Sequence, residues 1–520
     1  MSYPPSTLIH WLLAAAPIAV VLVLMVVFRW GGAKAGPVGW FVALILAATV
    51  FRSGVDLLAY AQLEAVFLTL YVLYIIWMAL VLFRVVERAG AIGVIGQGII
   101  RLTADRVLQL LILAWVFSAF LQGVAGFGVP IAVVAPLLIG LGFDPVIAVA
   151  GTAIGHSWSV TFGDMASSFN ALIAATGMDG RVLAPWSGIL LGFTCFGCGL
   201  AVVHAFGRWQ ALRQGLPAIA LVGGSMALTQ HLLAISGLWN LAGFVAGMVG
   251  LAAAALVTRL PQYRRAAGAA RSGAENGPMT LWLAVLPYLI LVVLVAAAEL
   301  WSPLHQALNQ VHLTAPFPQV ETGYGWVTAE RMGKKTSLFG HPGALLAYAS
   351  AIAFAVYRWR GLLQRADLPK ILRGTVRSAI PSSIGIASMV GMATMMDRAG
   401  MTYTLARGLS SAVGQLFPLA SPYIGLLGAF MTGSNTNSNV VFAPLQKATA
   451  ELALLNVLII LAAQTAGGSL GSMLAPAKVI VGCSTAGLEG QEGKVMRLTV
   501  PYGLIITGAV GLITWLVARG

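Results

Sequence analysis

The chain has 520 residues, of which 59% are hydrophobic and only 9% are charged, and its mean hydropathy is +0.89. A soluble domain carries about 25% charged residues, so this composition excludes an ordinary soluble protein and indicates a membrane protein with many spans. The formal net charge of +14 does not indicate nucleic-acid binding. The basic residues gather in short segments between apolar stretches, as in cytoplasmic loops of membrane proteins. We therefore expect a lipid bilayer and no nucleic acid as partners.

Uncharged windows at residues 8–28, 65–83, 281–298 and 499–518 are each long enough to cross a bilayer. We expect an all-α polytopic membrane protein with about 12 to 14 transmembrane segments, several of them broken. The first window is longer than the apolar region of a secretory signal and lacks its basic start. It therefore predicts a permanent helix, with the N-terminus on the extracytoplasmic side.

The first half of the chain, residues 1–258, contains two apolar regions that polar residues interrupt, at 108–143 and 146–176. These interruptions predict re-entrant hairpins or broken helices near 108–176. Continuous helices are predicted near 184–206, 217–234 and 237–258. The segment 259–280 is rich in Ala, Gly and Arg, and it predicts a cytoplasmic basic linker between two halves.

The second half, residues 281–520, opens with an apolar helix at 281–300. The longest polar stretch follows at 301–340; the number of crossings places it outside the cytoplasm. We expect an irregular loop there, with a structured lid as the alternative. A helix at 342–357 leads to a second basic cytoplasmic segment at 358–377, a helix at 378–397, broken helices near 403–485, and a final helix.

An unusual polar run lies in this second half, where residues 432–439 read Thr-Gly-Ser-Asn-Thr-Asn-Ser-Asn. Such residues are poor helix formers, because their short side chains compete for backbone hydrogen bonds. A bilayer tolerates non-helical backbone only where protein buries it or where it lines a wet cavity. The run therefore predicts a helix break that holds a binding site.

A similar pattern occurs in the first half. Residues 120–128 and 430–439 both follow an apolar helix, both enter a run of small residues, and both are followed by Ala-Pro. Second interruptions come at 151–164 and 464–478. Matching interruptions predict two inverted repeats with a transport site between them, where half-helix N-termini favour an anion. The alternative is that the glycines only let helices pack closely.

These patterns select ten candidate substrate-binding residues. An intramembrane lysine is by default a functional candidate, and Lys478 could pair with a substrate carboxylate; the alternative is that it snorkels to the membrane surface. The candidates are Gln122, Gly126, Gly128, Ser434, Asn435, Thr436, Asn437, Ser438, Asn439 and Lys478.

Four further residues are candidates for ion or proton coupling: His156, Ser157, Asp164 and Gln464. On a continuous helix, residues 156, 159 and 163 share one face, with Asp164 near its edge. A histidine and a carboxylate at one cavity could relay a proton. The alternative is a hydrogen-bonded structural pair. For the adjacent Asp397 and Arg398, a structural ion pair or an anchor at the membrane interface is the favoured interpretation.

The chain has no Walker A loop, no HExxH and no Gly-x-Ser-x-Gly on a predicted strand, so we expect neither an enzyme nor an ATP-driven pump. We expect no cofactor and no metal. Cys195 and Cys198 form a CxxC inside an apolar stretch, which favours packing over metal or redox chemistry.

The chain resembles the lactate permease family at residues 120–130, 430–439 and 467–488. The resemblance implies transport of short hydroxy-monocarboxylates such as lactate and glycolate, with H⁺ or Na⁺ as coupling ion. It implies an elevator with a scaffold domain and a transport domain in the cell inner membrane, and by analogy a homodimer. Ser434-Asn435-Thr436 matches a motif that lines substrate and sodium sites in the wider superfamily.

Two departures from the family stand out: Gln122 where many members have Glu, and Asn435 where many have Asp. From the broken helices and the family resemblance, we predict a secondary active transporter that imports a small monocarboxylate, coupled to a proton or sodium gradient. The alternatives are a carrier of another organic anion, an ion antiporter or channel, and a scaffold or sensor without transport.

Overall fold

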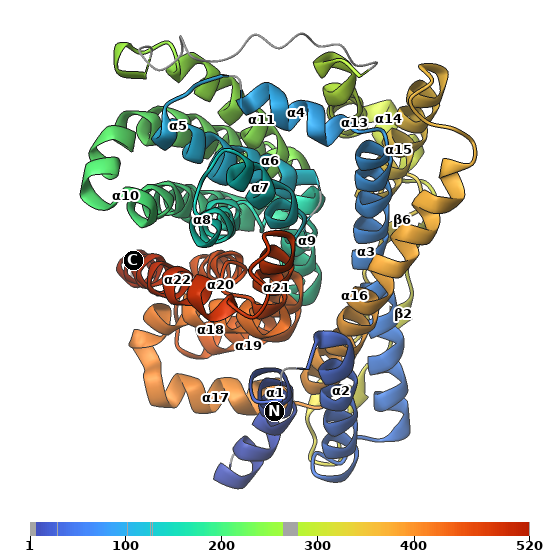
Figure 1. The fold of residues 1–520 in the computed structure, drawn as a ribbon. Helices are drawn as coiled ribbons and strands as arrows, with labels where there is room; N and C mark the ends of the chain where they lie inside the picture. The colour runs from blue at the N-terminus through green and yellow to red at the C-terminus, as the bar shows by residue number, and fades with distance from the viewer. Residues whose placement is uncertain are drawn as a thin grey trace.

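The structure is a computed structural model that describes residues 7–28, 30–100, 102–124, 126, 128–263 and 279–518. Most of the predicted basic linker, residues 264–278, lies outside this range. Figure 1 shows two groups of helices beside each other, a flat layer and a larger bundle. The layer and the bundle each combine segments from both halves of the chain.

The layer is made of helices that are mostly long, with the 7-residue α14 (Ser302–Leu308) as its short member. Its members are α2 (Gly32–Thr49), α3 (Val55–Arg88), α13 (Leu281–Leu300), α14 (Ser302–Leu308), α15 (Pro342–Trp359) and α16 (Asp367–Arg398). Three more helices connect the two groups: α4 (Ala91–Ile100) lies at the top between the layer and the bundle, and α1 (Leu8–Val26) and α17 (Met401–Val413) lie below the bundle in Figure 1.

The bundle begins with α5 (Arg106–Leu110), a π-helical stretch η1 (Leu111–Phe117), α6 (Ser118–Val124), α7 (Val129–Gly140), α8 (Pro145–Ser157), α9 (Gly163–Thr176), α10 (Gly180–Ile235) and α11 (Trp239–Val257). It is completed by η2 (Gly414–Leu416), α18 (Phe417–Thr432), α19 (Asn435–Leu452), α20 (Val457–Gly471), α21 (Pro476–Thr485) and α22 (Glu492–Val517). The blue-to-green helices lie against the orange-to-red helices, so the two halves meet inside the bundle (Figure 1).

The expected polytopic helical fold is confirmed. Within the described part of the chain, 11 helices are long and apolar enough to cross a membrane. One of them, the 56-residue α10, turns back sharply at Gly207 and Arg208 and so forms two legs. The predicted helices at 184–206 and 217–234 are these two legs, and the second leg begins earlier than predicted.

The second basic segment differs from the prediction. Residues 358–377 are not one loop, because α16 begins at Asp367 and carries Lys370, Arg373 and Arg377 on its first turns. The Asp367 carboxylate accepts hydrogen bonds from the backbone N–H of Gln364 (2.9 Å) and from Arg88 of α3 (2.9 Å). An acidic residue in the first turn also favours a helix start, which is why the helix extends into the basic segment.

The polar stretch at 301–340 is structured rather than irregular. It forms short strands β1 (His312–Leu313), β2 (Pro316–Phe317), β3 (Val320–Glu321), β4 (Val327–Thr328), β5 (Arg331–Met332) and β6 (Thr336–Ser337). They pair antiparallel as β1 with β6, β2 with β5 and β3 with β4, which makes one long hairpin that we call the ribbon. Strands of two residues are too short to show the alternation of apolar and polar residues by which a strand is recognised in a sequence.

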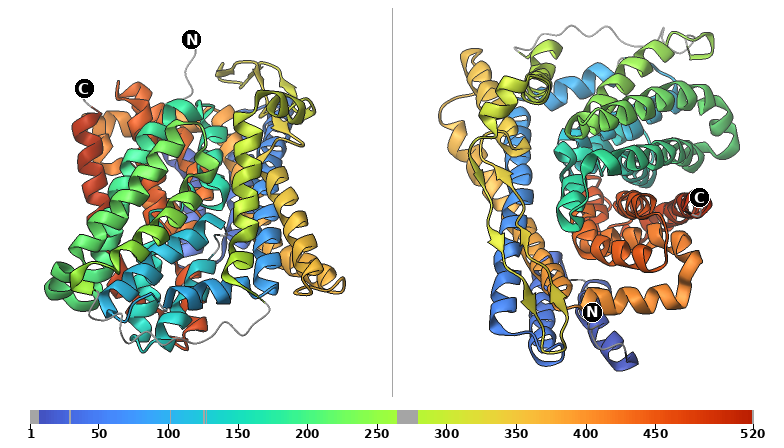
Figure 2. Two further views of the ribbon diagram at one scale, coloured as in Figure 1. Left: turned by 90° about the horizontal axis from the view of Figure 1, so that it is seen from above. Right: turned by 180° about the vertical axis from the view of Figure 1, so that it is seen from behind.

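The ribbon lies lengthwise across the layer, as the yellow strands in Figure 2 (right) show. Its tip docks on the α2–α3 turn, where the N–H of Gly323 donates to the carbonyl of Arg52 at 2.8 Å. Near the tip, Tyr324 packs edge-on against His10, with ring centroids 6.1 Å apart. The start of α1 and the ribbon are therefore on the same side of the molecule, opposite the start of α16 (Figure 2, left).

The layer and the bundle meet through a compact apolar contact. Leu68 and Val72 of α3 and Val390 of α16 pack with Ala171 of α9 and Val440 of α19. Small and β-branched side chains dominate this contact, and ion pairs lie at its edge rather than within it. Since α9 and α19 both begin at helix breaks, this contact places the breaks close to the layer.

Candidate functional site

Four broken helical segments meet inside the bundle. The breaks lie between α6 and α7, α8 and α9, α18 and α19, and α20 and α21. Prolines stand at the start of α7 and α21, and Ser434 caps α19, where its hydroxyl accepts from the N–H of Asn437 at 3.3 Å. Such breaks present unpaired backbone N–H groups and helix dipoles to the same small volume.

The break before α19 is shorter than the polar run predicted. Only Gly433, with φ +70°, and Ser434 leave the helical conformation, while Asn435 to Asn439 form the first turns of α19. The hydroxyl of Ser434 supplies the hydrogen bond that the first turn lacks. The three asparagines therefore project from a helix rather than from a loop.

The first two breaks are joined by Gly126 and Asp164. The backbone N–H of Gly126 donates to a carboxylate oxygen of Asp164. A Cβ on residue 126 would collide with the other carboxylate oxygen, so only glycine allows this approach. Asp164 itself has φ +48°, which is uncommon for a residue other than glycine. This backbone turns the buried carboxylate toward the break before α7.

Asn435 joins the second, third and fourth segments. Its Nδ2 donates to Thr161 Oγ1 at 3.0 Å and to the carbonyl of Thr465 at 3.3 Å. Its Oδ1 lies against Gly468, where a Cβ would clash, and has no hydrogen-bond partner in the described structure. This amide therefore orients the start of α19 and still has a free acceptor.

Two other predicted residues also keep a free acceptor. Gln122 and Asn437 are buried, and neither Gln122 Oε1 nor Asn437 Oδ1 has a partner among the described residues. Buried polar atoms are nearly always hydrogen-bonded in native proteins. Together with Asn435, these amides are the candidates best placed to receive a ligand.

The remaining polar residues of α19 bind their neighbours. Asn439 Nδ2 donates to the carbonyl of Ser168 and to Thr465 Oγ1, both at 2.9 Å, and Ser438 Oγ donates to the carbonyl of Gly425 at 2.8 Å. Thr436 shares a hydroxyl contact of 3.1 Å with Ser168. These bonds hold α19 against α9 and α18, which is a structural role.

Gln464, predicted for coupling, lies on this structural side. Its Nε2 donates to Ser438 Oγ at 3.0 Å, and its Oε1 accepts from Gln446, which in turn binds Ser421. The chain of buried amides crosses α18, α19 and α20. These side chains hydrogen-bond to one another, so Gln464 has a structural role beside the site.

Lys478 lies in the first turn of α21, just after Pro476, and it is buried. Its side chain packs beside Gly128, and its neighbour Ala477 lies beside Gly433. Lys478 is close enough to Asp164 and His156 to interact electrostatically with both. A cation, a carboxylate and three amides with free acceptors therefore surround the meeting point of the breaks.

The predicted common helical face of His156 and Asp164 is wrong. The helix α8 ends at Ser157, and residues 158–162 form turns before α9. His156 Nδ1 contacts the carbonyl of Thr152 at 2.8 Å, whereas Nε2 has no partner in the described structure. Ser157 Oγ donates to the carbonyl of Ile154 at 2.8 Å and contacts Cys198 Sγ at 3.3 Å.

Asp397 and Arg398 do not pair with each other. Arg398 donates from Nε to Glu64 of α3 at 2.7 Å, and Asp397 pairs with Arg331 of the ribbon at 3.3 Å. Arg331 also binds Glu64 at 2.9 Å. The four side chains clamp the ribbon to the layer, which is a structural role.

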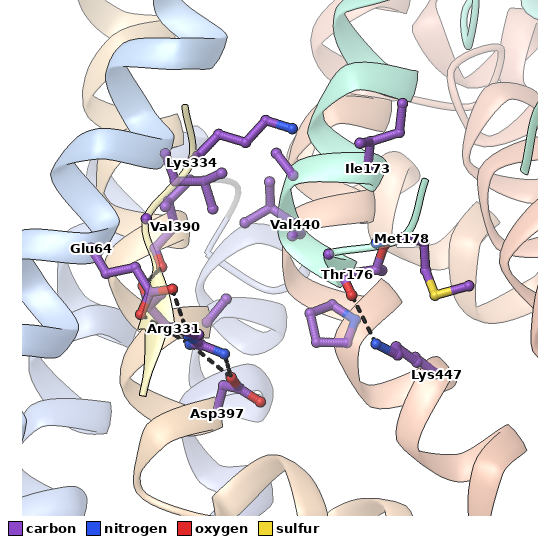
Figure 3. A pocket seen from close by; sticks show the side chains of 18 of the residues that line it. Glu64, Ile173, Thr176, Met178, Arg331, Lys334, Val390, Asp397, Val440 and Lys447 are labelled. Atoms are coloured by element: carbon purple, nitrogen blue, oxygen red, sulfur yellow. Dashed lines mark hydrogen bonds and ion pairs between the residues drawn. The ribbon is translucent and has the colours of Figure 1, made fainter. Parts of the chain in front are cut away.

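Sequence reasoning missed a cavity of about 430 Å³ between the layer and the bundle. Figure 3 shows Glu64, Val390 and Asp397 on the layer side and Ile173, Thr176 and Lys447 on the bundle side. Lys447 donates to the carbonyl of Thr176 at 2.9 Å. A lysine so soon after the polar run at 432–439 was the sequence signal that could have identified it.

The fold and the site define the class of the protein. The described residues include 11 helices that are long and apolar enough to cross a membrane, and four helix breaks meet at a buried polar centre. Broken helices of this kind are typical of membrane transporters. The family profile described as L-lactate permease matches residues 10–519. The chain belongs to the L-lactate permease family, whose members are transporters and not enzymes.

Similar proteins agree over nearly the whole chain. An L-lactate permease of Escherichia coli (strain K12) is 28% identical, covering 98% of this chain and 95% of that protein. The glycolate permease GlcA of the same strain gives the same three figures. An L-lactate permease of Bacillus subtilis (strain 168) is 27% identical over 98% of this chain and 96% of that protein.

Among solved structures, the YdaH transporter of Alcanivorax borkumensis is similar at a TM-score of 0.46 and 17% identity, covering 98% of each chain. MtrF of Neisseria gonorrhoeae is similar at a TM-score of 0.43 and 13% identity, over 86% of this chain and 81% of that one.

Proposed function

We propose that this protein is a secondary active transporter that imports a small monocarboxylate of the lactate or glycolate type across the cell inner membrane. The observation that carries the proposal is the buried centre where Lys478 and Asp164 meet three side-chain amides from two of the breaks. The relatives named for L-lactate and glycolate support the substrate class.

In this proposal Lys478 pairs with the substrate carboxylate. Asn435, Asn437 and Gln122 present acceptor oxygens, and these suit the hydroxyl group of a 2-hydroxy acid as donor. The backbone N–H groups near Gly126 and Ser434 add hydrogen-bond donors at helix starts. A dicarboxylate would bring a second negative charge for which the centre has no second cation among the described residues.

Asp164 is the proposed coupling group. With Lys478 charged and Asp164 ionised, the centre is balanced, and an arriving carboxylate adds a buried negative charge that costs free energy. Protonation of Asp164 restores the balance, so one proton would accompany one anion. A sodium ion is the second candidate, because the three free amide oxygens are also ligands of the type that sodium binds.

The proposal includes the arrangement in the membrane. The halves 1–258 and 281–520 are inverted repeats joined by the cytoplasmic linker 259–280, and the ribbon and the N-terminus face outward. The bundle moves as the transport domain against the layer as scaffold, and two copies form a homodimer. The small apolar contact through Leu68, Val390, Ala171 and Val440 supports this movement, because it contains few interactions that would lock one position.

Counterflow in proteoliposomes tests the proposal. Purified protein loaded with unlabelled L-lactate or glycolate should take up the labelled acid, and a pH gradient should accelerate net uptake. Uptake that requires sodium instead of a pH gradient would favour the sodium candidate. Absence of exchange for every hydroxy acid would overturn the substrate assignment. Uptake without counterflow would contradict a carrier mechanism.

Variants test the site. Lys478→Gln should lower uptake roughly ten- to hundredfold, since a hydrogen bond to a charged group contributes about 1.5–3 kcal/mol. Asn437→Ala should lower it less. Lys494→Gln on the exposed start of α22 removes the same charge outside the site, so it should leave uptake unchanged. Equal effects of Lys478→Gln and Lys494→Gln would disprove the site.

A further inference from the structure

The cavity between the layer and the bundle has walls from both parts. Glu64 and Asp397 line the layer side, Thr176 and Lys447 line the bundle side, and residues 331–335 of the ribbon cover one end. One end of the cavity therefore lies against the ribbon. The cavity is distinct from the buried centre, whose residues do not line it.

The cavity leads toward the buried centre along α19. Its lining residues on this helix are Val440, Pro444, Lys447, Ala448 and Glu451. At 100° per residue they occupy one face, and the same face one turn earlier carries Asn437. A solute that follows this face of α19 inward from the cavity reaches the amide that has a free acceptor.

The charges of the cavity are not balanced locally. Four basic and three acidic side chains line it, but Glu64 already pairs with Arg331 at 2.9 Å and with the buried Arg398 at 2.7 Å. Asp397 also pairs with Arg331. Neither Lys334 nor Lys447 forms an ion pair among the described residues. Lys335 has no ion pair there either but is exposed, so the two partly buried ammonium groups of Lys334 and Lys447 remain available to an anion, against the exposed Glu451.

The two lysines are on opposite walls. Lys334 follows the strand that Arg331 clamps to α3 and α16, and its ammonium lies over the Tyr71 ring at 4.8 Å from the centroid. Figure 3 shows it reaching from the ribbon toward the bundle. Lys447 is fixed on α19 by its bond to Thr176. A small anion in the cavity would lie between a cation of the layer and a cation of the bundle.

We infer that this cavity is an outer binding site for the carboxylate substrate, in which Lys334 and Lys447 capture the anion before it reaches Lys478. The inference rests on the proposed function, since the captured anion is the transported one. The lysines set the apparent affinity and the rate of capture, whereas the buried centre sets the maximal rate. Charges of this kind act mainly on association and weaken with ionic strength.

The test is the concentration dependence of counterflow for Lys334→Gln and Lys447→Gln. At low ionic strength each variant should raise the KM for L-lactate about three- to tenfold, with the maximal rate within about twofold of the original protein. High salt should remove most of the difference. Lys334→Arg and Lys447→Arg retain the charge and should remain near the original KM.

Lys370→Gln is the matched control, because it removes one exposed positive charge near the start of α16, at the other end of this helix from Asp397. Its KM and salt dependence should not change. An unchanged KM in both cavity variants, or a lower maximal rate at unchanged KM, would overturn the outer site. Failure of the original protein to exchange any monocarboxylate would instead overturn the proposed function.

Discussion

The backbone N–H of Gly126 donates a hydrogen bond to the carboxylate of Asp164 and so links two helix breaks in the first half of the chain. The link depends on the absence of a side chain at residue 126. It also holds a carboxylate that interacts electrostatically with Lys478. Backbone geometry and the charge of the proposed site are therefore determined by the same contact.

Gly126→Ala should disrupt this contact. The added methyl group overlaps Asp164, and forcing extra volume into a packed interior costs about 1–3 kcal/mol. We expect a lower midpoint of thermal unfolding in detergent and strongly reduced counterflow. Gly224→Ala is the control, since a Cβ there meets nothing within 4 Å. If both variants unfold and transport alike, the close approach at Gly126 has no importance.

Asp164→Asn should separate exchange from accumulation. The amide oxygen can still accept from Gly126, but the side chain no longer binds and releases a proton. We expect counterflow to persist while accumulation driven by a pH gradient falls at least about tenfold, equivalent to about 1.4 kcal/mol of lost coupling. Asp179→Asn, at the exposed cap of α10, is the control because asparagine also caps helices. Full accumulation by Asp164→Asn would exclude Asp164 as coupling group.

Asn435→Asp restores the acid that many relatives carry. An ionised carboxylate cannot donate to the carbonyl of Thr465, which the Asn435 amide now does at 3.3 Å. Leaving such a buried group unsatisfied costs about 1–3 kcal/mol. We expect reduced uptake at neutral pH and recovery at acidic pH, where the protonated acid can donate again. The pH profile of initial uptake rates measures this, and a profile identical to that of the original protein would contradict it.

The helical class and the positions of the breaks could be predicted from the sequence, because they follow directly from its composition and from its runs of small polar residues. The length of the break at Gly433 and Ser434 could not be predicted, because it depends on the Ser434 cap, after which the helix begins again at once. The helix α8 ends at Ser157 and Asp164 has a positive φ, so the helical-face argument for His156 and Asp164 failed. The cavity joins Glu64, Arg331 and Lys447, and no local pattern relates residues so distant in the chain.

His341 gives a prediction about pH and stability. It lies at the start of α15, stacked on Tyr74 with centroids 5.0 Å apart and edge-on to Tyr71 at 4.7 Å. Burial, and then the nearby Lys334, lower the pKa of His341 to about 3. A histidine in the unfolded chain has a pKa of about 6.5. Between about pH 3 and pH 6.5, therefore, His341 binds a proton in the unfolded chain but not in the folded protein.

Stability should therefore fall as pH decreases from about 6.5, by at most about 1.4 kcal/mol per pH unit from this residue. His341→Phe retains an aromatic ring between Tyr71 and Tyr74 and cannot be protonated. Between pH 7.5 and 5.0, the midpoint of thermal unfolding in detergent should drop less for His341→Phe than for the original protein. His305→Phe, a half-exposed histidine near the same ribbon, should show the original drop. Parallel curves for His341→Phe and the original protein would show that His341 is not held neutral.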